Sequence, residues 1–352
     1  MPALAAWVHN LDPFALRIAG DVGVRWYGLA YILGFAFAWW ALTALAKRGK
    51  ILLRPEQVAD AMLVIVFATL VGGRLGYVLV YDRSLITTIL PAPPWWGVLA
   101  INRGGMASHG GMVGLIISCW WIGRRTGAPM LHVMDLLALV CPVGLLLGRI
   151  ANFINGELLG KIVAMPGEPS PWWSVKFPTE LLEGHAPRLT PEQELALVRL
   201  LNEAAPGLPP GQQERALISA IQHGAADLAA RLEPLLAARH PSQLYQGAVE
   251  GLVVGGVLWM LWRTPRKPGV IAAWFLILYG IGRIATEFIR LPDAHLSARS
   301  WGARPFGFSY GQWLSVMMVA GGTALLVYAA RRAGPKLGGW RTRPETHSPP
   351  AS

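Results

Sequence analysis

Ionisable side chains interrupt several apolar runs of this chain, and they are the first candidates for chemistry because charged groups at membrane depth are costly. The isolated ones are Arg74, His109, Asp135, Arg149, Glu157 and Glu250. Four others share one helical face at i, i+4, i+8 and i+11, namely Tyr279, Arg283, Glu287 and Arg290. Two interpretations stay open: Glu287 forms structural ion pairs with its neighbours, or the arginines bind an anion from outside the protein. A phospholipid phosphate suits the planar arginine fork.

The densest polar segment is G-R-I-A-N-F-I-N-G-E-L-L-G, residues Gly148–Gly160. On a continuing helix, Arg149, Asn152 and Asn155 share one face, because they recur at intervals of three. The glycines that follow permit a turn and a close backbone approach. The alternative is a helix end with solvated amides. The density of polar groups favours a binding site.

His109 stands among glycines at the start of another apolar run. A histidine can act as a base near neutral pH, although it can equally be a hydrogen-bonded structural residue. A further polar segment, His240–Tyr245, precedes a later run, and its Ser242 is placed to cap a helix.

Other classes of site have little support in the sequence. The remaining histidines have no metal-ligand spacing, and no nucleophile elbow or phosphate-binding glycine loop occurs. Cys119 and Cys141 lie inside apolar runs, away from the polar segments, which argues against a disulfide scaffold and a cysteine nucleophile. We expect no metal and no cofactor.

Composition indicates a membrane protein. The 352 residues are 53% hydrophobic and only 14% charged, with a mean hydropathy of +0.41. Soluble domains carry about 25% charged residues. The net charge of +11 would suggest nucleic-acid binding in a soluble protein. Here the basic residues cluster at the ends of apolar runs, so the membrane interpretation is preferred and no nucleic-acid partner is expected.

The apolar runs predict an all-α integral membrane protein with seven transmembrane helices, since a spanning helix needs about 20 apolar residues. The predicted spans are 22–46, 58–80, 106–122, 131–150, 244–261, 269–288 and 310–330. The third is short and rich in glycine.

Basic residues in the short connections predict the orientation, because they concentrate on the cytoplasmic side. One side has fourteen: Lys47, Arg48, Lys50, Arg54, Arg124, Arg125, Arg263, Arg266, Lys267, Arg331, Arg332, Lys336, Arg341 and Arg343. The other has seven: Arg17, Arg25, Arg83, Arg103, Arg290, Arg299 and Arg304. The N-terminus is therefore expected outside and the C-terminus in the cytoplasm.

Four regions are expected along the chain. Residues 1–160 hold helices 1–4, 161–239 form an external helical head, 240–334 hold helices 5–7, and 335–352 form a disordered cytoplasmic tail. Within the head, Thr190, Pro191 and Gln193 predict a capping box at a helix start. Residues 84–105, rich in proline and tryptophan, are expected to lie in the membrane interface.

Several of these segments together resemble the prolipoprotein diacylglyceryl transferase family. The matching segments follow the family's order over residues 26–293 and are Trp26–Gly28, Gly72–Tyr77, Gly104–Gly111, Gly148–Gly160, His240–Tyr245 and Tyr279–Arg290 with Pro292 and Asp293.

The resemblance implies an activity, partners and a location. The chain would move the sn-1,2-diacylglyceryl group of phosphatidylglycerol onto the lipobox cysteine of a prolipoprotein, forming a thioether and releasing glycerol 1-phosphate. This is the first step of bacterial lipoprotein maturation. The partners would be phosphatidylglycerol, the prolipoprotein signal peptide and the bilayer. The family implies a multi-pass protein of the bacterial plasma (inner) membrane, with seven spans and an active site toward the outer face.

The resemblance also assigns roles to residues. The catalytic ones would be His109, Arg149, Tyr279 and Arg283. Those binding phosphatidylglycerol would be Tyr27, Arg74, Arg149, Asn152, Asn155, Glu157, Gly160, Glu287 and Arg290. His109 is the candidate base for the substrate thiol. The alternative is that an arginine-rich field lowers the thiol pKa and that His109 supports the fold.

Two departures and two rival functions accompany the resemblance. Asn102 and Arg103 replace an aromatic and a charged or polar residue before the histidine segment, and the insert 161–239 is longer than expected. The insert either docks or gates the prolipoprotein or is solvated decoration. A lipid transporter or scramblase would use a similar arginine-lined cavity without a covalent product. A phosphatidyl transferase would need an acidic metal-binding repeat, which the sequence lacks.

Overall fold

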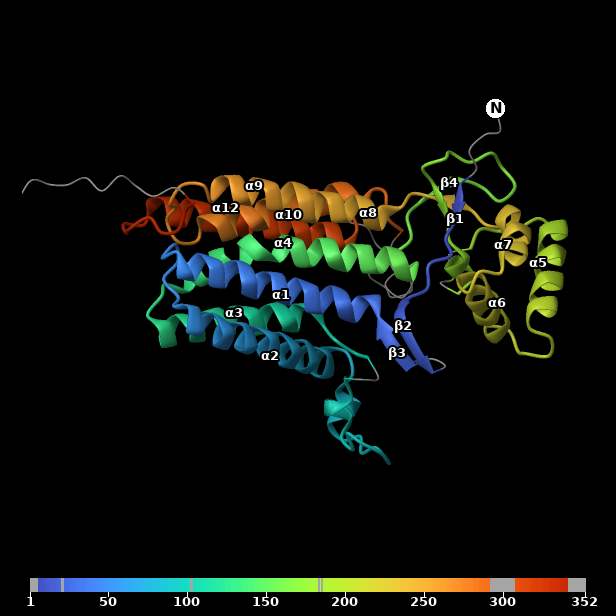
Figure 1. Ribbon diagram of the computed structural model, residues 1–352, viewed down its shortest axis with the longest axis horizontal. Coiled ribbons are helices and arrows are strands. Elements are labelled where there is room, and N and C mark those ends of the chain that lie inside the picture. The colour runs from blue at the N-terminus through green and yellow to red at the C-terminus, as the bar shows by residue number, and fades with distance from the viewer. Residues whose placement is uncertain are drawn as a thin grey trace, which may run out of the picture. The chain divides into compact units, whose positions relative to one another are not determined.

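A computed structural model describes residues 6–19, 22–101, 104–182, 184, 186–291 and 308–340, and the protein is mostly helical (Figure 1). Among these residues, six helices are long and apolar enough to cross a membrane. They are α1 (Trp26–Lys47), α2 (Pro55–Val80), α4 (Met130–Asn155), the continuous helix Ser242–Leu261, α10 (Val270–Glu287) and Gly311–Arg331 of α12 (Tyr310–Arg331). They correspond to six of the seven predicted spans.

The remaining predicted span coincides with α3 (Ser108–Thr126), which is not one of the six. Its glycines and the basic pair Arg124 and Arg125 in its last turn make it less apolar than the others. The helix ends at Gly127, which has a φ of 74°, a conformation that glycine adopts without strain. A seventh span therefore stays a prediction.

The start of the first helix differs from the prediction. Residues Val22–Arg25 form strand β3, which pairs with β2 (Phe14–Ala19) in an antiparallel hairpin, so α1 begins at Trp26. The backbone N–H of Trp26 donates to the carbonyl of Pro13 at 3.1 Å. The apolar residues before Trp26 were wrongly included in the span because hydropathy does not distinguish a short strand from the first turn of a helix.

The helix Ser242–Leu261 contains a wider turn. It consists of α8 (Ser242–Gln246), the π-helix η6 (Gly247–Val253) and α9 (Val254–Leu261). π-helical turns are rare and frequently occur at functional sites. This one carries Glu250, which is fully buried.

The chain divides into two compact units. The first comprises residues 1–34, 142–255 and 276–320, and the second comprises 35–141, 256–275 and 321–352. Several long helices contribute residues to both.

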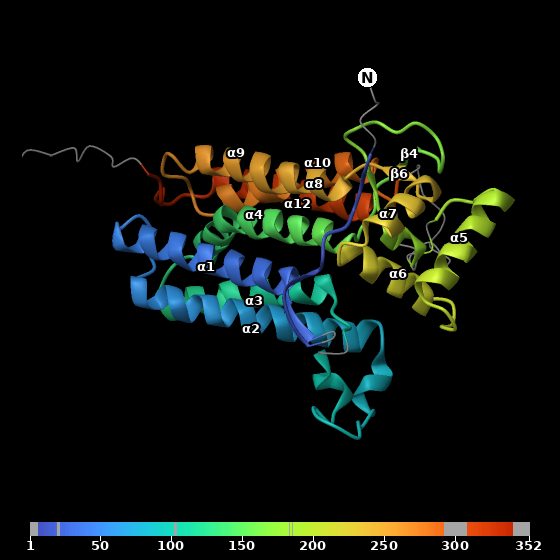
Figure 2. The ribbon, with the colours of Figure 1, turned by 45° about the vertical axis from the view of Figure 1, so that its right-hand side comes forward.

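The head belongs to the first unit and combines a small sheet with three helices. Strands β1 (Trp7–Val8), β5 (Val175–Lys176), β6 (Ala238–Arg239) and β4 (Ile162–Ala164) lie in the order β1-β5-β6-β4, and only β1 and β5 run parallel. The helices are α5 (Pro191–Ala204), α6 (Gln212–Gln222) and α7 (Ala226–Leu232), which lie together in Figure 2. The capping box at Thr190 is confirmed. The all-α expectation missed both sheets, since strands of two to six residues give little alternating pattern.

The connection after α2 has no regular element longer than one 3-10 turn among its described residues. In the part of the chain that the structure describes, the 3-10 helices are η1 (Arg83–Ile86), η2 (Gly97–Leu99), η4 (Pro178–Leu181) and η5 (Glu233–Leu235). Trp95 and Trp96 are 62% and 42% exposed, which fits the expected place of this connection in a membrane interface. Asn102 and Arg103 lie outside the described residues.

The beginning of the expected tail is held against the connection that precedes α10. Arg266 and Leu337 exchange backbone hydrogen bonds of 3.0 and 2.7 Å. Residues 341–352 lie outside the described part of the chain.

Candidate active site

The polar segment predicted at Gly148–Gly160 forms the last turn of α4 and the turn that follows it. The helix continues to Asn155, five residues beyond the predicted end, and thereby places Arg149, Asn152 and Asn155 on helical backbone. Gly156 then adopts a φ of 65° and Leu158 a φ of 57°. The carbonyl of Gly156 accepts a hydrogen bond of 2.7 Å from the hydroxyl of Thr179. The polar side chains therefore stand on an ordered turn.

The two asparagines of this turn share one carboxylate. Asn152 donates through Nδ2 to the hydroxyl of Tyr27 at 2.8 Å and to Oε2 of Glu157 at 3.3 Å. Asn155 donates through Nδ2 to Oε1 of the same glutamate at 3.1 Å. Gln243, from α8, donates to the backbone carbonyl of Glu157. The structure thus brings together four of the predicted site residues in one hydrogen-bonded network.

Arg149 has a partner that the sequence did not identify. Its Nε donates to Oε2 of Glu250 at 2.9 Å and its Nη2 to Oε1 at 3.3 Å. The side chain of Glu250 is fully buried and that of Arg149 is 15% exposed. Gly251 lets its helix pack closely against α4 here, because a Cβ at this position would lie 2.5 Å from Cβ of Leu146. The sequence left open whether this arginine forms an ion pair or binds an outside anion, and the structure pairs it with Glu250.

The guanidinium of Arg149 still has donors for a ligand. Nη1 carries no hydrogen bond to any described residue. The phenol groups of Tyr27 and Tyr279 lie in the neighbourhood of this arginine. The arrangement can therefore hold an anionic group between Nη1 and the neighbouring hydroxyls.

Arg283 forms the ion pair that the sequence left open. Its Nη1 lies 3.2 Å from Oε2 of Glu287, four residues later on α10. The other carboxylate oxygen of Glu287 accepts a hydrogen bond of 3.2 Å from the hydroxyl of Ser309. The ion pair between Arg283 and Glu287 is therefore present, and the role of Arg283 in the site stays a prediction.

The ends of the signature segment and of α10 are joined through backbone. Gly160 and Arg290 form an isolated antiparallel bridge, and the N–H of Leu291 donates to the carbonyl of Leu159 at 3.0 Å. A Cβ on Gly160 would lie 2.2 Å from the carbonyl oxygen of His240, which explains why glycine stands there. Gly160 and Arg290 therefore order the site through their backbone.

The segment before α8 supports the same turn. Ser242 was predicted to cap the helix, but it is the first helical residue, and its hydroxyl donates to the carbonyl of Leu158 at 2.9 Å. His240 stacks on Trp173 with ring centroids 5.1 Å apart. Burial lowers the pKa of His240, so the neutral ring is favoured in this stack. The polar motif thus braces the turn at Leu158.

His109 and Arg74 belong to the second unit. His109 is the second residue of α3, and its side chain is exposed. Arg74 lies on α2, is 5% exposed and donates to the carbonyls of Gly97, Val98, Gly104 and Gly105. A histidine so placed can meet a substrate proton, whereas the donors of this arginine are mostly occupied.

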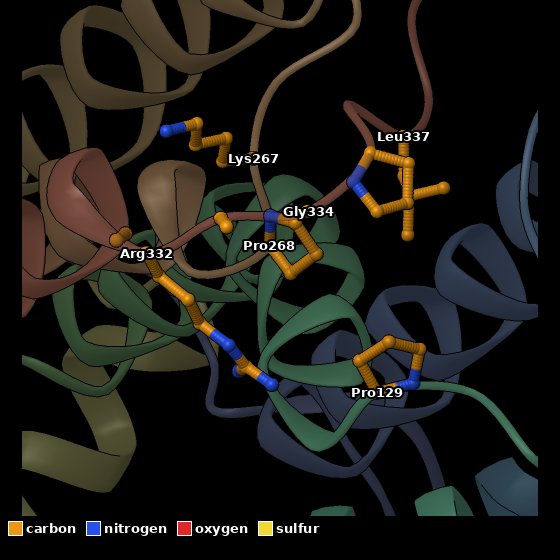
Figure 3. Close-up of a pocket in the computed structure, with 9 residues that line it drawn as sticks. Pro129, Lys267, Pro268, Arg332, Gly334 and Leu337 are labelled. Carbon is orange, nitrogen blue, oxygen red and sulfur yellow. The ribbon is translucent and has the colours of Figure 1, made fainter.

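A separate cavity of about 150 Å³ lies in the second unit and contains none of the predicted site residues (Figure 3). It is lined by Pro129, Lys267, Pro268, Ala329, Arg332, Ala333, Gly334, Pro335 and Leu337. No group of three or more His, Cys, Asp or Glu side chains that could hold a metal occurs among the described residues.

Sequence comparisons place these features in a known family. The family model for prolipoprotein diacylglyceryl transferase matches residues 13–328. A phosphatidylglycerol--prolipoprotein diacylglyceryl transferase from Bdellovibrio bacteriovorus is 40% identical, over 95% of this chain and 97% of that protein. Enzymes of the same name from Ectopseudomonas mendocina and Pseudomonas aeruginosa are 32% and 34% identical, each over 92% of this chain and 96% and 95% of their own lengths. The chain is a transferase and belongs to the prolipoprotein diacylglyceryl transferase family.

Proposed function

We propose that this protein transfers the sn-1,2-diacylglyceryl group of phosphatidylglycerol to the lipobox cysteine of prolipoproteins, the first step of their lipidation. The observation that carries the proposal is the family match over residues 13–328, which includes every residue of the hydrogen-bonded network at the end of α4. The names of the relatives state the lipid donor and the protein acceptor.

The proposal includes a topology. The chain is a multi-pass protein of the bacterial plasma (inner) membrane with α3 as its seventh span, an outer N-terminus and a cytoplasmic C-terminus. The first helical half is 1–160 and the outer head is 161–239. The second helical half is 240–334 and the tail is 335–352. The excess of basic residues in alternate connections supports this orientation.

The reaction is a substitution at carbon. The cysteine thiolate attacks the glyceryl carbon that bears the phosphate ester, so a C–S bond forms and a C–O bond breaks. The electron pair of the broken bond stays on the phosphate oxygen, and glycerol 1-phosphate leaves. The thiol proton goes to His109, which is exposed at the start of α3.

The first unit supplies the phosphate site in this proposal. Nη1 of Arg149 and the hydroxyls of Tyr27 and Tyr279 contact the phosphate, and Asn152 orients Tyr27 through the 2.8 Å hydrogen bond. Arg283, held by Glu287, stabilises the charge that develops on the leaving oxygen. Asn155, Glu157, Gly160 and Arg290 keep the turn in shape.

A transfer assay tests the function. Purified protein in detergent is mixed with phosphatidylglycerol and a lipobox peptide, and mass spectrometry follows the peptide. We expect a diacylglyceryl mass gain on the cysteine, and none on a peptide with serine at that position. No gain, while the Bdellovibrio bacteriovorus relative works in parallel, would reject the enzyme and make lipid transport the next function to test.

The phosphate site has its own test. Arg149→Ala should lower the transfer rate by about 10²–10³, the effect of removing one donor that stabilises developing charge. Arg199, on α5 of the head, provides the control, and Arg199→Ala should transfer normally. Full activity of Arg149→Ala would reject the phosphate site.

A further inference from the structure

Arg74 is surrounded by backbone carbonyls, which the proposed reaction does not explain. Its Nε donates to Val98 at 2.7 Å and its Nη2 to Gly97 at 2.6 Å. Its Nη1 donates to Gly104 at 2.7 Å and to Gly105 at 2.8 Å. Two acceptors lie in η2 and the other two lie shortly before α3, so one side chain on α2 holds both of these places.

The same geometry leaves Arg74 poorly suited to hold a phosphate. A guanidinium has five N–H donors, and four of them are used here. The side chain is only 5% exposed. A headgroup could reach at most one donor unless it displaced backbone carbonyls, which would then be left buried and unpaired.

The start of α3 is fixed to α2 beside this arginine. The N–H of Ala107, the residue before α3, donates to the carbonyl of Gly73 at 2.9 Å. A Cβ on Gly110 would lie 2.1 Å from the carbonyl oxygen of Gly72, so the two helices touch through backbone there. Figure 2 shows α2 and α3 lying side by side. His109 stands between these two contacts.

Gly105 completes the arrangement. Its φ is 80°, and a Cβ there would lie 2.6 Å from Cε1 of Tyr77 and 2.8 Å from Nη1 of Arg74. A side chain at this position would push the arginine away from its acceptors. Gly104 and Gly105 therefore supply two carbonyl acceptors for Arg74, and Gly105 also leaves the space that its guanidinium occupies.

We propose that Arg74 is a positioning residue, which holds η2, the pair Gly104 and Gly105, and thereby the start of α3, so that His109 meets the substrate thiol. This inference rests on the proposed transferase function. It deepens that function by separating Arg74 from the residues that bind phosphatidylglycerol.

Lysine cannot replace Arg74 in this role, because its ammonium is a single point with three donors while the four acceptors surround a planar fork. Misplacing a reacting group by about 1 Å can lower a rate about 10²-fold. We therefore expect Arg74→Lys to lower kcat about 10²-fold and to leave the KM for phosphatidylglycerol within about twofold. A headgroup ligand would instead raise KM.

The control is Arg83→Lys. Arg83 also donates to a backbone carbonyl, that of Leu79 at 2.8 Å, but it is exposed and makes that single bond among the described residues. We expect its kcat and KM to match those of the wild type. Gly105→Ala should reproduce the loss of kcat with unchanged KM, since it displaces the same guanidinium.

Arg74→Ala gives an independent readout. Added guanidinium ion fits the vacated set of carbonyls and should restore kcat, whereas methylammonium at equal concentration should not. If Arg74→Ala does not fold, Arg74→Lys and Gly105→Ala still decide the matter. Unchanged kcat in Arg74→Lys, or a raised KM with kcat intact, overturns the positioning role alone. An inactive wild type beside an active relative overturns the transferase function and this inference with it.

Discussion

Removal of Glu250 should destabilise the protein strongly, because the carboxylate is the buried partner of Arg149. Two hydrogen bonds of 2.9 and 3.3 Å join the pair, and the Glu250 side chain is fully buried. At such separations and an effective dielectric constant of about 20, the Coulomb attraction is about 5 kcal/mol. Breaking a buried pair by removing one member costs about 3–5 kcal/mol, since the other charge stays buried.

The assay is the free energy of unfolding in detergent, measured for a double-mutant cycle. We expect Glu250→Ala to lose about 3–5 kcal/mol. The variant that carries both Glu250→Ala and Arg149→Ala should lose less than the sum of the two single changes, because it leaves neither charge unpaired.

The control is an ion pair whose contacts are shorter but whose side chains are more exposed to solvent than those of Arg149 and Glu250. Arg231 and Glu203 in the head are joined by two hydrogen bonds of 2.7 and 2.6 Å, and their side chains are 42% and 57% exposed. Glu203→Ala should leave stability nearly unchanged, because exposed pairs contribute little. Equal losses in Glu203→Ala and Glu250→Ala, or strictly additive effects in the cycle, would refute the argument from burial.

Three further predictions concern single residues. His109→Gln should lower the transfer rate by at least about 10², the usual contribution of a general base, and near-normal turnover would leave His109 a structural role only. Gly160→Ala should lower the melting temperature and the yield of folded protein, since its Cβ would lie 2.2 Å from a carbonyl oxygen of His240. Gly148→Ala, with nothing within 4 Å of its Cβ, is the control, and equal behaviour of the two would contradict this account. Burial lowers the pKa of His9 from 6.5 to about 4, so the folded state binds fewer protons than the unfolded state between these values. The stability that neutral His9 confers is complete above pH 6.5 and falls as the pH drops toward 4, by roughly 2 kcal/mol at pH 5. Melting curves at pH 7 and pH 5 should show a smaller difference for His9→Phe than for the wild type.

The sequence predicted the helical placement of the candidate site residues because their spacing is local. Arg149, Asn152 and Asn155 recur at helical intervals, and the structure places them on the last turns of α4. The contacts between Asn152, Asn155 and Glu157 span at most five residues, so they follow from the helix and the glycine turn. Short-range patterns of this kind can be predicted from periodicity alone.

The partners of these residues were not predictable in the same way. Glu250 lies 101 residues after Arg149, and its orientation depends on a π-helical turn, which periodicity does not indicate. Thr179 and Gln243 donate to backbone carbonyls of the turn. Gln243 belongs to the polar segment His240–Tyr245, but the sequence does not indicate its partner, and no motif marks Thr179. Similarly, nothing in the spacing of Arg74 shows that four carbonyls, of η2 and of the pair Gly104 and Gly105, surround it.

Under the proposed function, the pairing of both arginines changes how the site would recognise a phospholipid. Arg149 with Glu250 and Arg283 with Glu287 are electrically neutral pairs, so a bound phosphate adds a negative charge instead of cancelling a positive one. Recognition then depends on oriented donors, which the carboxylates hold in place before the lipid arrives. Such preorganised groups stabilise charge that develops on the leaving oxygen without further rearrangement. Glu250→Gln should therefore lower kcat even where the variant folds, since Arg149 gains net charge but loses its fixed orientation. A rise in kcat for this variant would show that net positive charge, and not orientation, limits the reaction.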